Sequence, residues 1–443
     1  MRRMIARGTV TLIGLTLLLG TSVRAVDQTK EELQKAINDL HVQGADFWIY
    51  NDLPAAIAQA KKFNKPIFVT FRCVPCKNCA GFDAEVAKGS DIIAKFATEK
   101  FVSLRQVEMK GVDLTQFQFD HDLNWAAMFI NADGTIYGRY GTQSADGADA
   151  YNSIASLVKA MERVLELHAN YSANKEALAA KKPPQKPYKT PLEMPGMENK
   201  EKLSGTTLRN NCVHCHMIHD AEQNQWRKEG TFSLEKLNRY PLPDNIGIHI
   251  DKDDGRRIQR VMANSPAEVA GLKVGDDITH VDGQPIVSIA DIQWVLNSKP
   301  DAGASIQFSI QRQGRPQTLT IQPASGWRKT DISWRASRWT IRPRPGFGPQ
   351  ELNAKELAAL NRPDIQRAYR VQFMNGNNPE GKAAQQVGIK IGDIIIAIDD
   401  KPITQSPPEF QLWVRLNRKV GDQLPLTLLR GGKPVRVVLP LVE

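Results

Sequence analysis

The chain has 443 residues, of which 41% are hydrophobic and 24% are charged. This length exceeds one ordinary hydrophobic core and predicts about three domains, and the composition excludes collagenous and wholly disordered proteins. The formal net charge is +10, but Arg2, Arg3, Arg7 and Arg24 lie in a predicted targeting segment. Without them 54 basic residues face 48 acidic ones, a bias too small to predict binding to nucleic acid.

Residues 1–25 have the pattern of a secretory signal peptide. A basic start is followed by an apolar stretch over residues 9–20 and by small residues before a cleavage point at Val26. This apolar stretch is short for a membrane span, which needs about 20 residues. We therefore expect a mature protein that is periplasmic or secreted, with no membrane span after signal cleavage. The alternative is a protein anchored in the inner membrane by an uncleaved signal.

Between residues 46 and 171 the hydrophobic pattern alternates between helical and extended periods. The predicted elements are helix 53–63, strand 66–71, helix 80–96, strand 101–109, strand 125–130, a turn at 131–134, strand 135–140 and helix 152–168. This order predicts a small α/β layer structure.

The next two segments contain few apolar residues. Residues 172–198 include the Pro- and Lys-rich run 181–195, whose composition predicts an extended linker that does not pack. Residues 199–242 are a short polar connector that carries two cysteines.

The last part of the chain contains an internal repeat. Residues 271–276 (GLKVGD) recur as 388–393 (GIKIGD), and residues 281–286 (VDGQPI) recur as 398–403 (IDDKPI), both at an offset of 117. These motifs resemble PDZ domains of the bacterial HtrA-associated kind. The resemblance covers residues 243–325 and, less completely, 346–443, and it implies two mainly β domains with helices.

In PDZ domains a peptide adds as an extra strand at a sheet edge, and its terminal carboxylate meets backbone amides of a glycine-containing loop. The resemblance implies that helix 289–296 walls the groove of the first repeat. The implied peptide-binding loop of that repeat consists of Asn245, Ile246, Gly247 and Ile248. The implied partners are protein or peptide clients, and the alternative is that the repeats serve only internal packing or dimerisation.

The second repeat departs from this pattern. A long insert separates its candidate loop at residues 345–348 from GIKIGD, and Pro407 and Pro408 precede its groove helix. No Gly-x-Ser-x-Gly nucleophile segment occurs in the chain, so we do not expect a serine protease.

Three cysteines, Cys73, Cys76 and Cys79, form two overlapping C-x-x-C motifs between a predicted strand and a predicted helix. A helix amino terminus and the neighbouring Lys77 both favour the thiolate form. The segment resembles the thioredoxin superfamily, especially its secreted thiol-disulfide interchange branch, over residues 46–171. Measured against that family, the flanking distances select Cys76 as nucleophile and Cys79 as resolving thiol, and leave Cys73 as an extra thiol.

Other interpretations of this cluster remain. The pair Cys73 and Cys76 has proline inside the motif, as is usual in the family. The family's cis-proline position falls on Trp125, which predicts different substrate docking because a non-proline cis bond costs about 3 kcal/mol. The non-redox alternatives are a structural disulfide with one remaining thiol and a metal site of three thiolates.

The other two cysteines lie in a C-x-x-C-H motif formed by Cys212, Cys215 and His216. This spacing is typical of covalent c-type haem, in which the cysteines form thioethers and the histidine binds the iron. We therefore predict haem c at these residues, with His216 as a ligand of the haem iron. The alternatives are a local disulfide and a zinc site.

The order of these parts resembles a bacterial family of secreted thioredoxin/PDZ proteins, some of whose members carry selenocysteine at the redox position. It implies an exported thiol-disulfide oxidoreductase or electron-transfer protein that exchanges electrons with a redox partner protein. The alternatives are a non-catalytic periplasmic PDZ adaptor with structural cysteines and a haem redox sensor.

Overall fold

The computed structural model describes residues 29–37, 47–72, 80–88, 91–205 and 211–443. The predicted signal peptide and the residues Cys73, Cys76 and Cys79 lie outside this part of the chain. Within it, no helix has both the length and the apolar character needed to span a bilayer.

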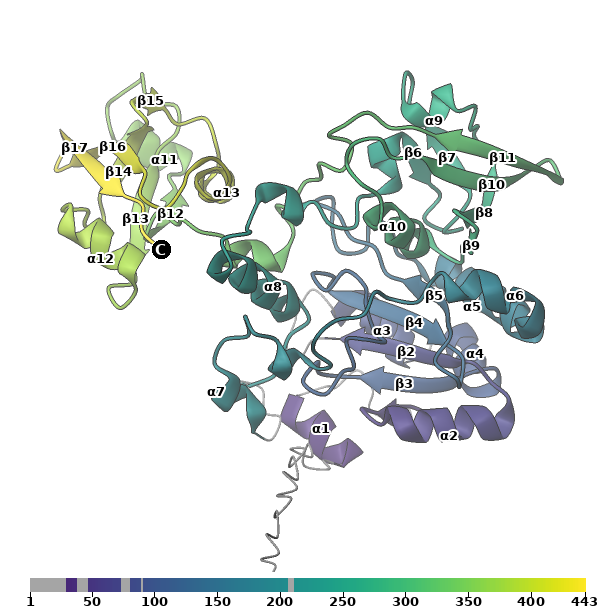
Figure 1. Ribbon diagram of the computed structural model, residues 1–443. Coiled ribbons are helices and arrows are strands. Elements are labelled where there is room, and N and C mark those ends of the chain that lie inside the picture. The colour runs from purple at the N-terminus through teal and green to yellow at the C-terminus, as the bar shows by residue number, and fades with distance from the viewer. Residues whose placement is uncertain (1–28, 38–46, 73–79, 89–90, 206–210) are drawn as a thin grey trace, which may run out of the picture.

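The first domain is built on a five-stranded sheet with the strand order β1-β3-β2-β4-β5 (Figure 1). The strands β1, β3 and β2 run parallel, whereas β4 and β5 are antiparallel to their neighbours. The elements of the domain are α1 Lys30–Ile37, β1 Ile49–Tyr50, α2 Leu53–Phe63, β2 Ile67–Arg72, α3 Ala80–Lys88, α4 Asp91–Glu99, β3 Val102–Gln106, β4 Trp125–Ile130, β5 Ile136–Tyr140 and α5 Ile154–Ala169. The predicted helix 80–96 is therefore two helices.

Both faces of this sheet are covered, so every residue of β2 is buried. Successive side chains of a strand point to opposite faces. Phe68 belongs to the hydrophobic cluster under α3, α4 and α5, whereas Val69 and Phe71 belong to the cluster on the α2 face. The cluster on the α2 face also contains Met194 and Ile218, from the two segments that follow the domain.

The prediction that residues 172–198 form a linker that does not pack is wrong. The helix α6 Tyr171–Ala179 continues from α5, and Lys181 is 1% exposed. The carbonyl of Lys181 accepts a hydrogen bond from the Arg139 guanidinium, and the carbonyl of Lys189 accepts one from the backbone N–H of Leu114. Backbone carbonyls remain acceptors whatever the composition, and here the polar edge of the first domain supplies the donors.

The end of segment 172–198 and the connector form helices along the same domain (Figure 1). They are η3 Pro191–Glu193, α7 Lys200–Ser204, α8 His216–Lys228 and η4 Leu234–Leu237. Apolar side chains within residues 188–203 and 213–221 complete the second layer on the sheet, because they belong to its cluster. Leu237 of η4 belongs to a separate small cluster with Ile332 and Ile341.

The first repeat is a β domain with its own hydrophobic core. Its strands form a four-stranded sheet, β11-β10-β8-β9, and a two-stranded sheet, β6-β7. The elements are η5 Pro243–Ile246, β6 Ile248–Ile250, β7 Ile258–Val261, α9 Pro266–Val269, β8 Asp277–Val281, β9 Gln284–Pro285, α10 Ile289–Asn297, β10 Ile306–Arg312 and β11 Arg315–Ile321. The predicted groove helix corresponds to α10.

The second repeat has a separate core and a sheet with the order β12-β13-β14-β16-β17, in which β15 pairs with β14. In Figure 1 it is set apart from the first domain. The elements from the preceding segment onward are η6 Ala336–Thr340, β12 Phe347–Glu351, α11 Ala354–Ala358, β13 Tyr369–Met374, α12 Pro379–Gln386, β14 Ile394–Ile398, β15 Lys401–Pro402, α13 Pro407–Asn417, β16 Gln423–Arg430 and β17 Lys433–Pro440.

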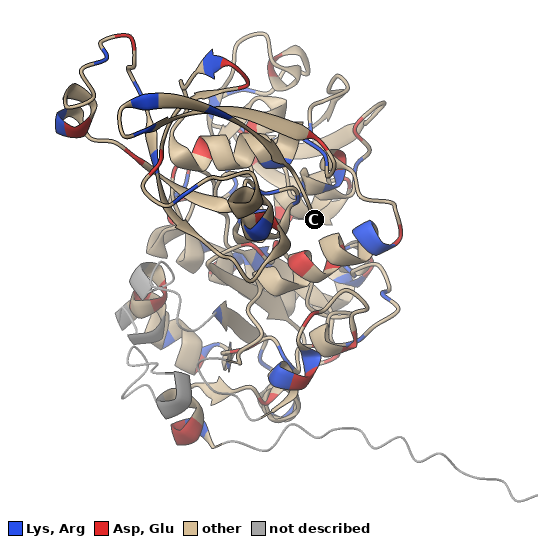
Figure 2. Cartoon of the chain, turned by 90° about the vertical axis from the view of Figure 1, so that its left-hand side faces the viewer, with Lys and Arg blue, Asp and Glu red and all other residues tan. Residues whose placement is uncertain are grey.

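In the view of Figure 2, Lys and Arg residues are interspersed with Asp and Glu residues along the described chain. This distribution agrees with the small net bias of the mature sequence.

Candidate functional site

The carboxyl end of β2 is held by one buried carboxylate. Asp83 of α3 is fully buried and accepts hydrogen bonds from Arg105 Nη1 and Nη2 at 3.1 and 2.6 Å. Arg72 Nε lies 2.8 Å from the same carboxylate, and Trp125 Nε1 donates to it at 3.0 Å. Asp83 therefore ties the first turn of α3 to the last residue of β2 and the first residue of β4.

This edge of the sheet is where the predicted redox motif begins and ends. Cys73 follows Arg72 directly, and Cys79 directly precedes α3. Trp125 pairs with Arg72 across the strands β4 and β2. The bond before Trp125 is not cis, since Arg342–Pro343 is the cis bond found among the described residues.

The second cysteine motif lies at the same edge of the sheet. The backbone N–H of Met109, just after β3, donates to the carbonyl of Val213 at 3.1 Å. Because β2 and β3 are parallel, their carboxyl ends meet at one edge. Cys212 and Cys215 flank Val213 and are 5% and 4% exposed. The structure thus brings the C-x-x-C-H motif to the edge from which the first motif departs.

The two cysteine side chains belong to different hydrophobic clusters. Cys212 lies in the cluster that contains Phe82 and Trp125, and Cys215 lies in the cluster that contains Phe71. A porphyrin joined to both sulfurs would have to displace side chains from these clusters. Haem attachment would therefore require these side chains to repack, and the haem stays a prediction.

His216 is the first residue of α8. Its Nδ1 lies 3.0 Å from Asp220 Oδ2, one helical turn further on, and its ring is nearly parallel to that of His214 at 5.7 Å. A carboxylate on Nδ1 is the usual partner of a histidine that binds a metal through Nε2. The histidine therefore fits the predicted role better than the buried cysteines do.

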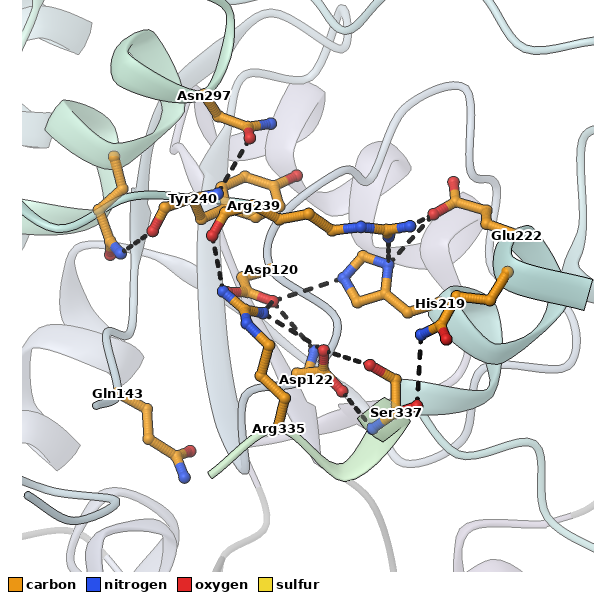
Figure 3. A network of polar contacts seen from close by, with 12 residues as sticks. Asp120, Asp122, Gln143, His219, Glu222, Arg239, Tyr240, Asn297, Arg335 and Ser337 are labelled. Carbon is orange, nitrogen blue, oxygen red and sulfur yellow. Dashed lines mark hydrogen bonds and ion pairs between the residues drawn. The ribbon is translucent and has the colours of Figure 1, made fainter. Parts of the chain in front are cut away.

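A buried polar network joins three distant parts of the sequence (Figure 3). Asp120 and Asp122 lie in the loop before β4, His219 lies in α8, and Arg335 precedes η6. Arg335 Nη1 donates to Asp120 Oδ1 at 2.7 Å and to Asp122 Oδ2 at 3.3 Å. Asp122 also accepts hydrogen bonds from the backbone N–H and hydroxyl of Ser337 at 2.8 and 2.7 Å.

The ligand atoms of Asp120, Asp122 and His219 lie within 4.8 Å of one another, as they would around a metal ion. The guanidinium of Arg335 already supplies the positive charge. Burial alone would raise the pKa of Asp120, but Arg335 and a hydrogen bond with His219 outweigh burial and hold this pKa well below its ordinary value. We therefore interpret the cluster as an ion-pair network that fixes the connector, not as a metal centre.

The adjacent His121 is 4% exposed, and its Nδ1 has no hydrogen-bond partner among the described residues. Burial, assisted by His219, lowers the pKa of His121 well below 6.5. His121 is therefore neutral at pH 7.

The predicted peptide loop of the first repeat forms a tight turn. Ile246 and Ile248 are fully buried. Gly247 has a φ of 90°, and a Cβ there would lie 2.1 Å from Ser265 Cβ, so this position requires glycine. Asn245 Nδ2 donates to the carbonyls of Trp327 and Lys329 at 2.8 and 2.9 Å.

Sequence reasoning missed the residues that brace these sites. Arg335 is more than 200 positions from both Asp120 and Asp122 in the sequence, and none of the three lies in a motif. The available signal was the run Asp120-His121-Asp122 directly before a predicted buried strand.

Family models match both halves of this architecture. The model described as thioredoxin-like matches residues 48–132. The model described as PDZ domain matches residues 244–322 and 376–441. These matches agree with the two folds expected from the cysteine motif and the internal repeat.

Curated relatives are similar over part of their length. A DegP-like periplasmic serine endoprotease of Pseudomonas putida is 34% identical over 237 residues, which cover 50% of this chain and 45% of the relative. The periplasmic serine endoprotease DegP of Salmonella typhimurium is 28% identical over 43% of this chain and 35% of its own. The chain thus spans less than half the length of these relatives.

Solved structures give shorter matches. The HtrA3 PDZ domain bound to a phage-derived ligand is 30% identical, covers 16% of this chain and 62% of its own, and has a TM-score of 0.14. The HtrA-type protease AlgW with a decapeptide is 16% identical, covers 33% of this chain and 50% of its own, and has a TM-score of 0.20. From the family models, the chain consists of a thioredoxin-like domain followed by two PDZ domains.

Proposed function

We propose that this protein is a periplasmic thiol-disulfide oxidoreductase whose PDZ domains bind peptide segments of client proteins. The observation that carries the redox part is the hydrogen bond between Met109 and Val213. It holds the pair Cys212 and Cys215 at the sheet edge where the C-x-x-C motif of a thioredoxin-like domain begins. Because Cys73 follows the last residue of β2 in the sequence, we propose that the two cysteine motifs undergo thiol-disulfide exchange with each other.

The proposed reaction uses Cys76 and Cys79. The thiolate of Cys76 attacks one sulfur of a client disulfide, and the second client sulfur leaves as a thiolate that takes up a proton. The thiolate of Cys79 then attacks the Cys76 sulfur and releases the first client sulfur. The client gains two electrons and two protons, and the protein keeps a Cys76–Cys79 disulfide.

The oxidised protein must then be reduced. We propose that Cys212 and Cys215 accept this disulfide by the same exchange and become oxidised in turn. A dithiol of a redox partner protein reduces the resulting Cys212–Cys215 disulfide.

The test compares serine variants of each cysteine in the mature protein. Cys76→Ser should lower the rate of reduction of a disulfide-linked peptide at least 100-fold, and Cys73→Ser should leave it within about threefold. The reverse result would show that Cys73 and Cys76 are the redox pair. Cys212→Ser should keep a single turnover but slow repeated turnover.

The redox potential separates this function from a non-catalytic adaptor. Thiol labelling at graded potentials should find a pair near −200 mV or above, whereas structural disulfides have potentials below about −300 mV. If every pair resists reduction in this way, the adaptor is the better proposal.

A second candidate is electron transfer or redox sensing through haem c, favoured by the contact between His216 and Asp220. Bound haem would supply one-electron chemistry. An absorption spectrum of protein made with haem-maturation machinery tests it, with Cys212→Ala as the control. A Soret band that the substitution abolishes supports haem, and its absence removes this candidate.

The similarities support the proposed location and the proposed peptide partners. The curated relatives are periplasmic proteins by name, and the similar HtrA3 PDZ domain binds a phage-derived ligand. Cell fractionation, compared with an alkaline phosphatase control, tests the location. Retention in spheroplasts would contradict it.

A further inference from the structure

The thioredoxin-like domain packs against the strand that walls one side of the predicted groove in the first PDZ domain. Tyr151, from the loop between β5 and α5, is 7% exposed and belongs to the core cluster that contains Ile248 and Ile250 of β6. Its hydroxyl donates to Asp244 Oδ2 at 3.2 Å, and its ring centroid lies 5.9 Å from that of His249. An incoming peptide strand would pair along this same strand.

The thioredoxin-like domain also contacts the helix on the other side of the groove. The hydroxyl of Ser288, the N-cap of α10, donates to the carbonyl of Arg139 at 2.5 Å. Asp291 accepts a hydrogen bond from the Arg139 backbone N–H at 3.1 Å, and its other oxygen lies 3.0 Å from Lys181 Nζ. Thr142 donates to Gln293 Oε1 at 2.7 Å. The first turns of α10 are thus covered by polar contacts from the neighbouring domain.

One arginine of the thioredoxin-like domain holds both sides together. Arg163 Nη1 donates to the carbonyl of Asp254, in the turn after β6, at 2.8 Å and to the carbonyl of Val287, just before α10, at 3.0 Å. Its Nη2 donates to Asp254 Oδ1 at 2.8 Å. The fit is close, because a Cβ at Gly138 of β5 would lie 2.1 Å from Val287 Cγ2.

The far end of the groove is covered by the chain that leaves the domain. The carbonyls of Trp327 and Lys329 accept the Asn245 amide of the predicted peptide loop. Arg328 Nη1 donates to the carbonyls of Leu296 and Asn297 at the end of α10. Trp327 itself lies in the core cluster of the domain.

We propose that the groove of the first PDZ domain is a docking site for the thioredoxin-like domain of the same chain, with Tyr151 in the place of a ligand side chain. A peptide that adds to β6 must first displace Tyr151 and break the Arg163 contacts. The two domains are joined covalently, so docking has the advantage of a high effective concentration over a dissolved peptide. The proposal concerns packing and holds whether or not the cysteines carry out redox chemistry.

Hydrogen exchange of the mature protein tests the docking directly. The double variant Tyr151→Ala/Arg163→Ala should speed amide exchange at residues 244–252 and 288–297 at least tenfold. Exchange in α13 of the second PDZ domain should stay unchanged. Arg257→Ala is the matched control, because Arg257 contacts the same Asp254 with a side chain that is 57% exposed, and it should have no effect.

Peptide binding tests whether the contact blocks the groove. The probe is a pool of random heptapeptides with free terminal carboxylates. The double variant should capture peptides through the first PDZ domain at least tenfold more tightly than the unmodified protein, as judged by protection of residues 244–252.

Rapid exchange at these residues in the unmodified protein, or equal peptide capture by the two proteins, would overturn the proposal. If the double variant does not fold, the single variant Arg163→Lys decides by the same measurement, since it keeps the charge and loses the bridge between Asp254 and Val287.

Discussion

The two PDZ domains share the turn that opens each repeat motif, and they differ in what covers the groove helices α10 and α13. In the first, Asp276 accepts hydrogen bonds from Arg312 Nε and Nη2, both at 2.7 Å. In the second, Asp393 accepts the same pair from Arg430 at 2.8 and 2.7 Å. The arginines also donate to the carbonyls of Gly271 and Gly388. The turn that opens each repeat motif is therefore built twice in the same way.

The groove helices show the difference. In α10 the polar side chains of Asp291 and Gln293 are 1% and 5% exposed, because the thioredoxin-like domain provides their partners. In α13 the carboxylate of the first turn, Glu409, is exposed and only caps its own helix. The repeat motifs therefore specify the turn that the two PDZ domains share. The buried Asp291 and Gln293 lie outside these motifs and mark a contact with another domain.

The largest effect should come from removing Asp291. Asp291→Ala leaves the Lys181 ammonium buried without its carboxylate, and breaking a buried ion pair in this way costs about 3–5 kcal/mol. The matched change Glu409→Ala removes only a helix cap, which is worth about 1 kcal/mol. Urea unfolding followed by tryptophan fluorescence measures both. Equal losses would contradict the contrast between the two helices.

A smaller effect, equal in the two PDZ domains, is expected when the aspartate of their shared turn is removed. Asp276→Ala and Asp393→Ala each remove the acceptor of an arginine fork and of one backbone N–H, from Lys273 and Lys390 respectively. Hydrogen bonds to a charged group contribute about 2 kcal/mol, so each change should lower the free energy of unfolding by about that amount. Losses that differ by more than twofold would show that the two turns are not equivalent.

The last effect is a loss of stability at acid pH. The pKa of His121 is lowered on folding, so the folded state binds fewer protons than the unfolded state below pH 6.5. The contribution of neutral His121 to the free energy of unfolding is therefore fully present above pH 6.5. It is lost on acidification, by up to about 1.4 kcal/mol per pH unit. His121→Phe should reduce this slope in urea unfolding between pH 5 and 7.5.

The second PDZ domain provides the control for this acid effect. It contains no histidine over residues 346–443. The protection of α13 amides, measured relative to their intrinsic exchange rate at each pH, should therefore stay constant over the same pH range. A parallel loss of protection there would assign the acid effect to other groups.

The sequence predicted the elements whose signal is local. The strand β4 was expected at its observed bounds, and the helix α2 likewise, since both have a regular hydrophobic period. The repeat motifs located both PDZ domains because glycine and aspartate at fixed spacing define a turn. The peptide groove and the redox pair stay predictions, and Cys73, Cys76 and Cys79 lie outside the described residues.

The contacts between domains could not be predicted from the sequence. Composition made residues 181–195 look like a linker, because prolines and lysines are typical of exposed chain, yet Lys181 is buried through a partner 110 positions away, Asp291. Likewise nothing local indicates that Arg335 binds Asp120. Such pairs depend on which surfaces the folded domains bring together.

The segment that covers the α2 face of the thioredoxin-like sheet determines how short a fragment of this half can be and still fold. The α2 face of that sheet is covered partly by Met194, Val213 and Ile218, which lie beyond the last strand and helix of the domain. A fragment that ends at residue 171 would expose this apolar face to water and favour aggregation. The smallest independently folding unit of this half of the molecule therefore extends at least through α8.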